Sequence, residues 1–464
     1  MSVRALALLL VVCGALFLEG IDIAMLNVAV PSIAVDIGLS VGAAHWVISA
    51  YVLGYGGFML LGGRIADIVG RRRVFLAALL RFVAFSGLGG IAQESWMLIL
   101  ARFITGVTAA FMTPAGFSIV TSTFPEGAQR NRALAVYGAV GAGGFVLGMV
   151  AGGLLTSVSW RWVFFAPMVL GGLLLLAGSL LIRPDGPRSA GGGFDIGGAL
   201  TATAGMVATI FALVSVGESH DVVAGAVGLG VGALMIIFFV VIERRTAAPL
   251  VQLDLLRRGP LSISSIVGLL FMASFFAFQF TVTLYLQELR GWSPLETGLT
   301  FAIMGLDLVF APIVTPWLVD RFGNAVIMTA GLVAAAASFT LMLRLQSDWS
   351  YVDLLPSLLL VAVAFTLVYG PLTAAATEGL ADSEHGVAGG VVYTGFQFGS
   401  ALGLALVTIA LVGGGVVAGL EDYRRALAVA AVLAVSAVIG GVVAVLRRRR
   451  ALKGSQAEPV GELA

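Results

Sequence analysis

Residues 63–73 read GRIADIVGRRR, a short charged stretch between two apolar runs at residues 43–65 and 74–93. Each of these runs is long enough to cross about 30 Å of hydrocarbon as a helix. A second stretch, PWLVDRFGN from Pro316, repeats the order aliphatic residue, any residue, Asp, two residues, Gly. The two copies predict an internal repeat, with one copy after the second helix of each half.

Apolar runs of similar length recur along the whole chain. Hydrophobic residues make up 59% of the sequence and charged residues 11%, whereas soluble globular chains carry roughly 25% charged residues. Such a composition cannot cover a water-exposed surface, so we expect an all-α polytopic membrane protein. The runs predict fourteen transmembrane helices near 6–33, 43–65, 74–93, 97–122, 133–157, 163–182, 197–216, 222–242, 262–286, 297–318, 325–345, 354–376, 387–412 and 426–446.

Lysine and arginine gather in the loops on one side of these spans. If the N-terminus is cytoplasmic, the cytoplasmic segments hold roughly 19 of the 26 basic residues and the outer segments about five, as the positive-inside rule requires. Both termini are then expected to face the cytoplasm, with the chain in the plasma membrane. The cytoplasmic basic residues are Arg4, Arg71 to Arg73, Arg130, Arg132, Arg183, Arg188, those of segment 244–258, Arg321 and Arg447 to Arg450.

The position of the repeat suggests how the spans are grouped. If spans 7 and 8 are an insertion between two six-helix halves, the plan is 6+2+6. Parallel repeats of this kind bind substrate near the middle of the membrane, between the halves, and we expect a functional monomer. The predicted divisions are an N-terminal half at 1–182, a linker with two extra helices at 183–258, a C-terminal half at 259–446 and a basic cytoplasmic tail at 447–464.

Several classes of function are excluded. Gly141-x-Gly143 is followed by Val146 where a dinucleotide-binding loop needs glycine, and no P-loop or zinc motif is visible. Cys13 is the only cysteine, which excludes a disulfide framework and a Cys-based metal site. The arginines lie in short loops and form no basic face for nucleic acid. We therefore expect no enzyme activity, no cofactor and no nucleic-acid partner, with protons as the coupling ion.

Several motifs resemble those of one transporter family. IDIAMLNVAVP from Ile21 is similar to its L-D-x-T-I-V-N-V-A-L-P, GRIADIVGRRR to its loop signature G-x-L-A-D-x-x-G-R-[KR], and Arg102 with Gly106 to its R-x-x-x-G signature. Trp46 and Tyr51 also stand where that family has them. Over nearly its full length the chain resembles the major facilitator superfamily, and within it the fourteen-helix drug:proton antiporters. The resemblance implies multidrug efflux, and with it antibiotic resistance, by an antiporter that uses the proton motive force.

Span 5 carries the family's antiporter signature with one departure. The segment GFVLGMVAGG is similar to G-x-x-x-G-P-x-x-G-G and keeps Gly144, Gly148, Gly152 and Gly153, but Met149 replaces the proline. The resemblance attributes to that proline a kink that controls leak. The segment therefore supports membership of the family more firmly than it supports obligatory exchange.

Three charged residues inside spans are candidates for proton coupling, because a charge at the bilayer centre is costly. Asp22 lies mid-span, where burial disfavours its charged form, and we expect it to bind a proton; the alternative is a structural hydrogen bond. Arg102 could reach Asp22, and the resemblance gives it a part in proton transfer; the alternative is a fixed ion pair. Asp307 is expected to attract cationic cargo or to act as a second proton site; its alternative is a polar contact with a neighbouring helix.

The two repeat stretches supply the candidates for gating. Asp67 and Arg71 are i,i+4 neighbours if the first stretch is helical, so they could pair with each other or with the end of a neighbouring helix. The resemblance implies a latch that breaks as the halves rock, with a weaker counterpart in the second stretch; the alternative for Arg71 is a charge that only sets topology. The gating residues are Gly63, Asp67, Gly70, Arg71, Asp320 and Arg321.

A site for mixed substrates needs apolar and aromatic walls with few polar groups. Glu19 lies on the same helix face as Asp22, and we expect it either to recognise substrate or to make a satisfied polar contact. The other candidates, for which simple helix packing is the alternative, are Asn27, Phe278, Gln279, Tyr285, Tyr369, Phe396 and Gln397.

Together these features predict a proton-coupled exporter of small hydrophobic or cationic compounds, because the spans hold acids without clustered cations. The alternative is a dedicated proton-coupled transporter of one metabolite, which either exports an endogenous product or imports a nutrient. A channel is disfavoured, because two halves with a gating signature fit alternating access better.

Overall fold

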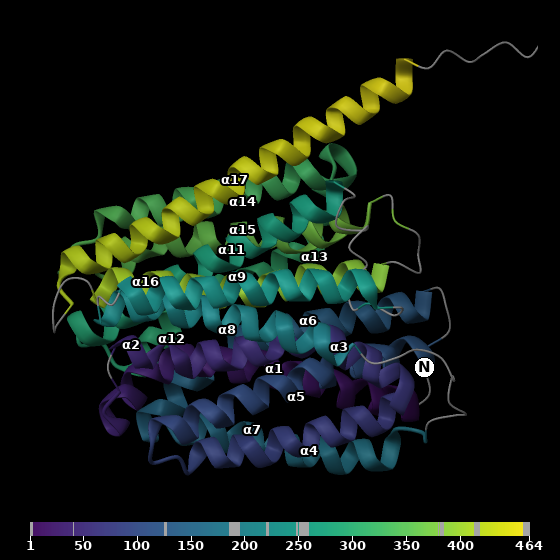
Figure 1. The fold of residues 1–464 in the computed structure, drawn as a ribbon, viewed down its shortest axis with the longest axis horizontal. Coiled ribbons are helices and arrows are strands. Elements are labelled where there is room, and N and C mark those ends of the chain that lie inside the picture. The colour runs from purple at the N-terminus through teal and green to yellow at the C-terminus, as the bar shows by residue number, and fades with distance from the viewer. Residues whose placement is uncertain are drawn as a thin grey trace, which may run out of the picture.

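The structure, a computed structural model, describes residues 3–39, 41–124, 128–184, 195–219, 222–246, 249, 259–378, 380, 385–412 and 418–457. These residues form helices and no strand, which confirms the all-α prediction for this part of the chain. The helices run side by side along one direction (Figure 1). They are α1 Val3–Ile37, α2 Val41–Ala44, α3 Trp46–Val69, α4 Arg71–Gly90, α5 Ser95–Thr123, α6 Ala128–Val158, α7 Trp162–Leu181, α8 Ile196–Ser219, α9 Val222–Arg245, α11 Gly259–Leu284, η1 Tyr285–Leu289, α12 Pro294–Ala302, η2 Ile303–Gly305, α13 Leu306–Phe322, α14 Asn324–Leu341, η3 Met342–Arg344, α15 Tyr351–Thr377, α16 His385–Val412 and α17 Leu420–Ala457.

Eleven helices in the described ranges are long and apolar enough to cross a membrane. In α9 only 11% of the most apolar window is buried within the protein, and an apolar surface of that extent needs lipid around it. The chain is therefore an integral membrane protein. Three further apolar stretches, in α3, α6 and α8, are shorter: Trp46–Met59, Gly143–Val158 and Gly197–Ala212.

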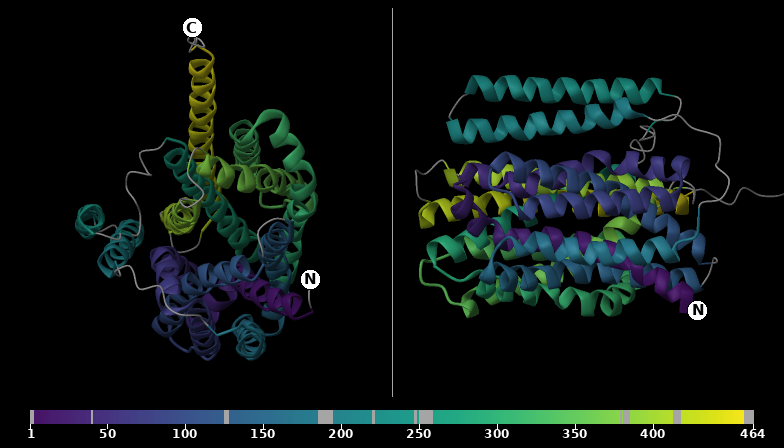
Figure 2. Two further views of the ribbon diagram at one scale, coloured as in Figure 1. Left: turned by 90° about the vertical axis from the view of Figure 1, so that its right-hand side faces the viewer. Right: turned by 90° about the horizontal axis from the view of Figure 1, so that it is seen from below.

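Two groups of helices pack in the same pattern. In the first group α1 packs on α6, α4 on α5 and α4 on α7; in the second, α11 packs on α16, α14 on α15 and α14 on α17. Seen end-on, the purple and blue helices of the first group gather on one side and the green and yellow helices of the second on the other (Figure 2, left). The matching pairs agree with the internal repeat that the two Asp-x-x-Gly stretches predict.

The two helices between these groups pack mainly on each other. α8 packs along α9 and also touches α3 and α16, so it contacts both groups. The pair lies to one side of the other helices (Figure 2, right). The expected insertion stays a prediction, as does the division at residues 183 and 258, which falls next to ranges outside the described residues.

The repeat stretches are helical junctions, which corrects their interpretation as loops. α3 continues to Val69 and α4 begins at Arg71, so only Gly70 separates them, with φ 113°. Gly323 separates α13 from α14 in the same way, with φ 83°. Each glycine adopts a conformation that a side chain would strain. Asp67 and Arg71 consequently lie on different helices, and the expected i,i+4 geometry is wrong.

Two helices differ from the predicted spans. The tenth span is interrupted, since α12 ends at Ala302 and a 3₁₀ turn precedes α13. The fourteenth span ends later than predicted, because α17 continues through the Arg447–Arg450 cluster to Ala457. The residues assigned to a separate basic tail therefore begin as a helical extension, which projects beyond the other helices in Figure 1.

Candidate functional site

A buried ion pair lies between α1 and α5. Nη1 of Arg102 donates to Oδ2 of Asp22 at 2.6 Å, and the two side chains are 2% and 1% exposed. Nε of Arg102 donates to the carbonyl oxygen of Val47 at 3.1 Å, and its guanidinium lies 4.4 Å from the centroid of the Tyr51 ring. The contact between Asp22 and Arg102 that the sequence suggests is present. Val47 and Tyr51 of α3 also hold the arginine in place.

The second carboxylate oxygen of Asp22 is the atom of this pair that could bind a proton. Oδ1 of Asp22 is buried and has no hydrogen-bond partner among the residues that the structure describes. A buried polar atom of this kind normally needs a partner, which a proton or a water molecule can provide. The arrangement can therefore accept a proton at Oδ1 without displacing Arg102 from Oδ2.

Glu19, one turn earlier on α1, lies in a separate set of contacts. Its Oε2 accepts hydrogen bonds from Tyr55 at 3.0 Å and from Thr113 at 2.6 Å, and the side chain is 3% exposed. The Thr113 hydroxyl also lies 2.8 Å from Tyr55 Oη and 3.0 Å from the Ala109 carbonyl oxygen. Tyr137 of α6 donates to the Thr113 carbonyl oxygen at 3.3 Å. In this conformation the carboxyl group faces hydroxyl groups and not an open cavity.

The sequence reasoning missed Tyr55 and Thr113, although a signal was present. Tyr55 follows Tyr51 by four residues, so both lie on one face of α3. Thr105 and Thr113 follow Arg102 at spacings that keep all three close to one face of α5. Polar residues that recur at helical spacing opposite a buried acid were therefore the pattern to search for.

The glycines of the antiporter signature let α6 lie directly against two helices. A Cβ atom built on Gly144, Gly148 or Gly152 would come within 2.6 to 2.8 Å of atoms of α1. One built on Gly153 would lie 2.5 Å from the carbonyl oxygen of Pro294, in α12. Since real Cβ atoms essentially never approach so closely, these glycines allow α6 to join the first group of helices to the second.

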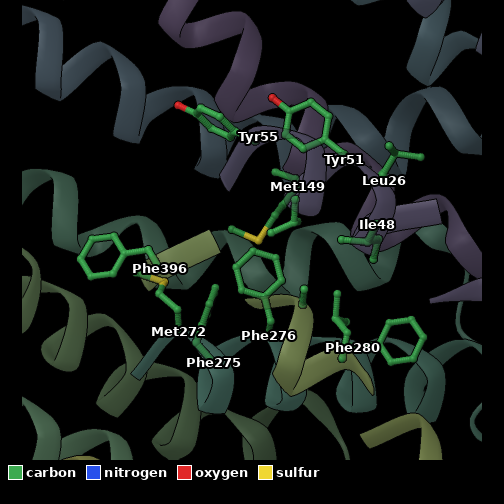
Figure 3. Close-up of a cluster of buried hydrophobic side chains, with 14 of the residues drawn as sticks. Leu26, Ile48, Tyr51, Tyr55, Met149, Met272, Phe275, Phe276, Phe280 and Phe396 are labelled. Atoms are coloured by element: carbon green, nitrogen blue, oxygen red, sulfur yellow. The ribbon is translucent and has the colours of Figure 1, made fainter. Parts of the chain in front are cut away.

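Met149, which replaces the signature proline, contacts the second group directly. Its sulfur accepts a hydrogen bond from Nε2 of Gln279, on α11, at 3.3 Å. A second bond between the groups runs from Nε2 of Gln287 to the Val28 carbonyl oxygen at 2.9 Å. In Figure 3 Met149 lies between Tyr51 and Tyr55 on one side and Phe276 on the other. The helices of the two groups are therefore joined near the end of the bundle away from the termini.

Tyr369, Tyr393 and Phe396 form an aromatic cluster in the second group of helices. Tyr369 donates to the Tyr393 hydroxyl at 2.9 Å, and each of their rings lies 5.5 Å from the Phe396 ring. Phe275 and Phe276 of α11 extend this apolar surface, and Figure 3 shows them opposite Tyr55. The structure thus brings together Tyr369 and Phe396, two of the candidates for substrate contact, and adds Tyr393.

The other substrate-contact candidates are dispersed. Gln397 lies where α16 meets α3, with its Cβ 2.8 Å from a Cβ built on Gly56. Asn27 is fully buried and donates to the Ile23 carbonyl oxygen at 3.1 Å. Tyr285 is also fully buried; its hydroxyl donates to the Gln346 carbonyl oxygen and its ring packs on Tyr423. Phe278 stacks on Phe339 within the second group, a packing role.

Asp307 lies at the start of α13, directly after the interruption of the tenth span. The backbone N–H of Leu308 hydrogen-bonds its carboxylate, while Oδ1 is buried with no partner among the described residues. Gly305, two residues earlier, approaches Val146 of α6, with only 2.4 Å between that side chain and a built Cβ. Asp307 therefore belongs to the stretch where α13 begins close to α6, apart from the hydrogen bonds of Asp22.

The gating candidate Arg71 and Asn324, which was not a candidate, occupy equivalent places in the two groups. Arg71 donates to the Ser118 carbonyl oxygen of α5 at 3.3 Å, and Asn324 donates to Glu378 at the end of α15 at 2.9 Å. Both residues directly follow a junction glycine, so the first junction is tied to α5 and the second to the C-terminal end of α15. Gly63 has room for a side chain, since the nearest atom to a built Cβ is 3.6 Å away.

The remaining gating candidates are Asp320, Arg321 and Asp67. Asp320 and Arg321 are exposed near the end of α13, where Arg321 lies 5.6 Å from the Phe322 ring centroid. The Asp67 side chain lies outside the described atoms.

Comparison with known proteins places the chain in a family. A family model described as Major Facilitator Superfamily matches residues 12–404. The chain belongs to the major facilitator superfamily. This facilitator is thus a transporter and not an enzyme, in agreement with the sequence-based expectation.

Curated relatives cover most of this facilitator's length. The puromycin resistance protein pur8 of Streptomyces alboniger is 36% identical over 408 residues, which cover 86% of this chain and 80% of that protein. The cephamycin export protein CmcT of Amycolatopsis lactamdurans is 35% identical over 411 residues, covering 86% and 83%. The lincomycin resistance protein of Streptomyces lincolnensis is 34% identical over 397 residues, covering 84% and 81%. These similarities fit the drug:proton antiporter group.

Solved structures agree on the fold. A nucleoside transporter, NupG, matches with a TM-score of 0.67 at 13% identity and covers 95% of this chain and 99% of its own. The POT family transporter PepTSo matches with a TM-score of 0.67 at 17% identity and covers 96% of this chain and 98% of its own. At these identities the likeness shows the facilitator fold alone.

Proposed function

We propose that this facilitator is a proton-coupled antiporter that exports small hydrophobic or cationic compounds by alternating access. The observation that carries the proposal is the buried pair of Asp22 and Arg102, in which one carboxylate oxygen has no partner among the described residues. The export and resistance relatives support the direction and the class of cargo. The aromatic cluster of Tyr369, Tyr393 and Phe396 suits an apolar or cationic body.

In the proposed mechanism, a proton on Asp22 weakens its attraction to Arg102. Neutralising one partner of a close buried pair removes most of the Coulomb attraction, so α1 and α5 can shift relative to each other. α6 packs on α1 through its glycines and on α12 through Gly153, so movement of α1 is passed to the contact between the groups. The junctions at Gly70 and Gly323 are the proposed gates at the other end.

The proposed topology has fourteen membrane-crossing helices in a 6+2+6 arrangement. The three shorter apolar stretches in α3, α6 and α8 would join the eleven longer candidates. The first and last described residues lie at the same end of the bundle (Figure 1), which suits an even number of crossings. The positive-inside rule then places both termini in the cytoplasm, in the plasma membrane, with the chain acting as a monomer.

Inverted membrane vesicles test this function. With the vesicle interior made acidic, an antiporter exchanges internal protons for external cargo, so we expect accumulation of puromycin or of a cationic dye. A protonophore should abolish the accumulation, and vesicles without the protein provide the background. Uptake that needs the opposite gradient would indicate an importer, and uptake indifferent to the gradient would refute coupling.

A second candidate is export of a single product. It is favoured by the names of the three relatives described above, each of which refers to one compound: puromycin, cephamycin or lincomycin. A growth-inhibition panel in a transporter-depleted host separates the two: resistance to one chemical scaffold indicates a dedicated exporter, and resistance to unrelated cations indicates a multidrug exporter.

Asp307→Asn should impair export of cationic cargo more than export of neutral cargo. The carboxylate lies apart from the contacts of Asp22 and has a buried oxygen without a described partner, so its charge is available to attract a cation. We expect transport of a cationic dye to fall about ten-fold or more, as loss of roughly 1.4 kcal/mol would give, with neutral cargo much less affected. Equal losses for both in the vesicle assay would argue for a structural role.

A further inference from the structure

The pocket of Glu19 holds a carboxyl group without a cation. Glu19 is 3% exposed, and Oε2 accepts hydrogen bonds from Tyr55 and Thr113 at 3.0 and 2.6 Å. Oε1 is buried and has no partner among the residues that the structure describes. A buried carboxylate usually pairs with a cation or a metal, so this pocket needs another route to neutrality.

The charged and titratable groups around Glu19 come from four helices. Glu19 interacts electrostatically with Asp22 on α1, Tyr51 and Tyr55 on α3 and Tyr137 on α6, whereas Arg102 on α5 interacts with Asp22 and Tyr51. Four other helices pack against α1, namely α2, α7, α11 and α12. None of them brings a described charged group to Glu19. Arg102 is the only cation of this set, and its hydrogen bonds go to Asp22 and to the Val47 carbonyl oxygen. Among the described residues, Glu19 therefore has no counter-ion.

We infer that Glu19 is a second proton-binding group, separate from the Asp22–Arg102 pair, and that Tyr55 and Thr113 hold it in either protonation state. The inference rests on the proposed function for its purpose, because a second bound proton is useful only in a proton-driven cycle. It also changes the role expected from the sequence: enclosure by α3 and α5 keeps the carboxyl group from the surface that cargo would contact.

The neighbouring hydroxyl groups can serve both protonation states without movement of heavier atoms. When Glu19 is ionised, Tyr55 and Thr113 both donate to Oε2. When a proton is added to Oε2, the new O–H can donate to the Thr113 hydroxyl oxygen. The Thr113 hydroxyl then donates to the Ala109 carbonyl oxygen, which already lies 3.0 Å away. In this change Glu19 gains one proton and the Thr113 hydroxyl group rotates. Every hydrogen-bond donor still has an acceptor.

Infrared difference spectroscopy tests the inference without cargo. The full chain in liposomes is titrated from roughly pH 5 to pH 9, a range that includes buried carboxyl groups, and the carbonyl bands of protonated carboxylic acids are followed. In wild type we expect separate bands for Glu19 and Asp22. Glu19→Gln should remove one and Asp22→Asn the other, each leaving the remaining band in place. If the Glu19→Gln spectra superimpose on wild type, Glu19 does not titrate and the inference is wrong.

Thr113 provides the matched control variants. Thr113→Val removes a donor to ionised Glu19 and should move the midpoint of the Glu19 band upward by about one pH unit or more. Thr113→Ser keeps the hydroxyl and should restore the wild-type midpoint, while neither variant moves the Asp22 band. Equal shifts for valine and serine would overturn the assigned role of the hydroxyl. Unchanged spectra together with lost dye binding in Glu19→Gln would assign Glu19 to cargo instead.

These outcomes are distinct from failure of the proposed function. If the protein is no antiporter, the vesicle assay fails while the Glu19 band can still titrate. If Glu19 is no proton site, Glu19→Gln leaves every titrating band in place while wild-type vesicles still accumulate dye.

Discussion

Asp22→Asn is expected to abolish accumulation of cargo against a gradient while the protein stays folded in the membrane. Asparagine has the shape of a protonated aspartate, a state that the proposed cycle itself visits, so Arg102 loses only the attraction that the cycle must interrupt. Without a titrating group at position 22, protonation can no longer switch the attraction between α1 and Arg102 on and off, so the pH gradient cannot drive the shift of α1 against α5. We expect accumulation in inverted vesicles to fall to the level of protein-free vesicles, while downhill exchange of labelled cargo continues.

Asp36→Asn is the matched control on the same helix. Asp36 is half-exposed and pairs with Arg161 at 2.8 Å, and exposed pairs of this kind contribute only about 0 to 1 kcal/mol. Accumulation should therefore stay within two-fold of wild type. Coupling retained in Asp22→Asn, at matched expression, would remove Asp22 from the mechanism.

Arg102→Ala should be the most destabilising of the changes discussed. It leaves Asp22 buried without a counter-ion, removes the bond to the Val47 carbonyl oxygen and empties the face of the Tyr51 ring. Breaking one side of a buried pair typically costs about 3 to 5 kcal/mol. The loss should be visible as a lower midpoint of thermal unfolding for the detergent-purified protein at neutral pH.

A double-mutant cycle separates the ion pair from simple packing. Arg102→Met with Asp22→Asn removes both charges and keeps volume, and replacing a buried pair by apolar groups is often close to neutral. The double variant should therefore unfold at a higher temperature than Arg102→Met alone. Losses that simply add would mean that the two residues do not interact energetically.

Much of the fold could be predicted from the sequence because lipid imposes a simple rule. Apolar runs of helical length located the helices, and the Asp-x-x-Gly spacing located both junction glycines, each of which adopts a positive φ. Boundaries were less accurate. α17 extends past Arg450 because consecutive arginines are compatible with a helix once it leaves the membrane, and hydropathy marks only the apolar part.

The sequence identified a site residue only where its type was unusual for an apolar span. Asp22 and Arg102 are charged residues within apolar spans, so each was visible on its own. Thr113 and Tyr137 look like ordinary helix residues, and their importance arises from α5 and α6 meeting α1. Tyr285 shows the reverse case. As an aromatic residue in a span it looked suitable for cargo, yet its contacts with Gln346 and Tyr423 place it in the packing of the second group.

The contact between Gln279 and Met149 bears on how fast the transporter can work. A thioether sulfur is a weak acceptor, so this bond contributes less than a bond from an amide to a carbonyl oxygen. The oxygen of the same Gln279 amide has no partner among the described residues, and water would supply one once the helices part. This bond therefore adds little to the cost of separating the two groups of helices, and we expect that its rupture does not limit the rate of turnover.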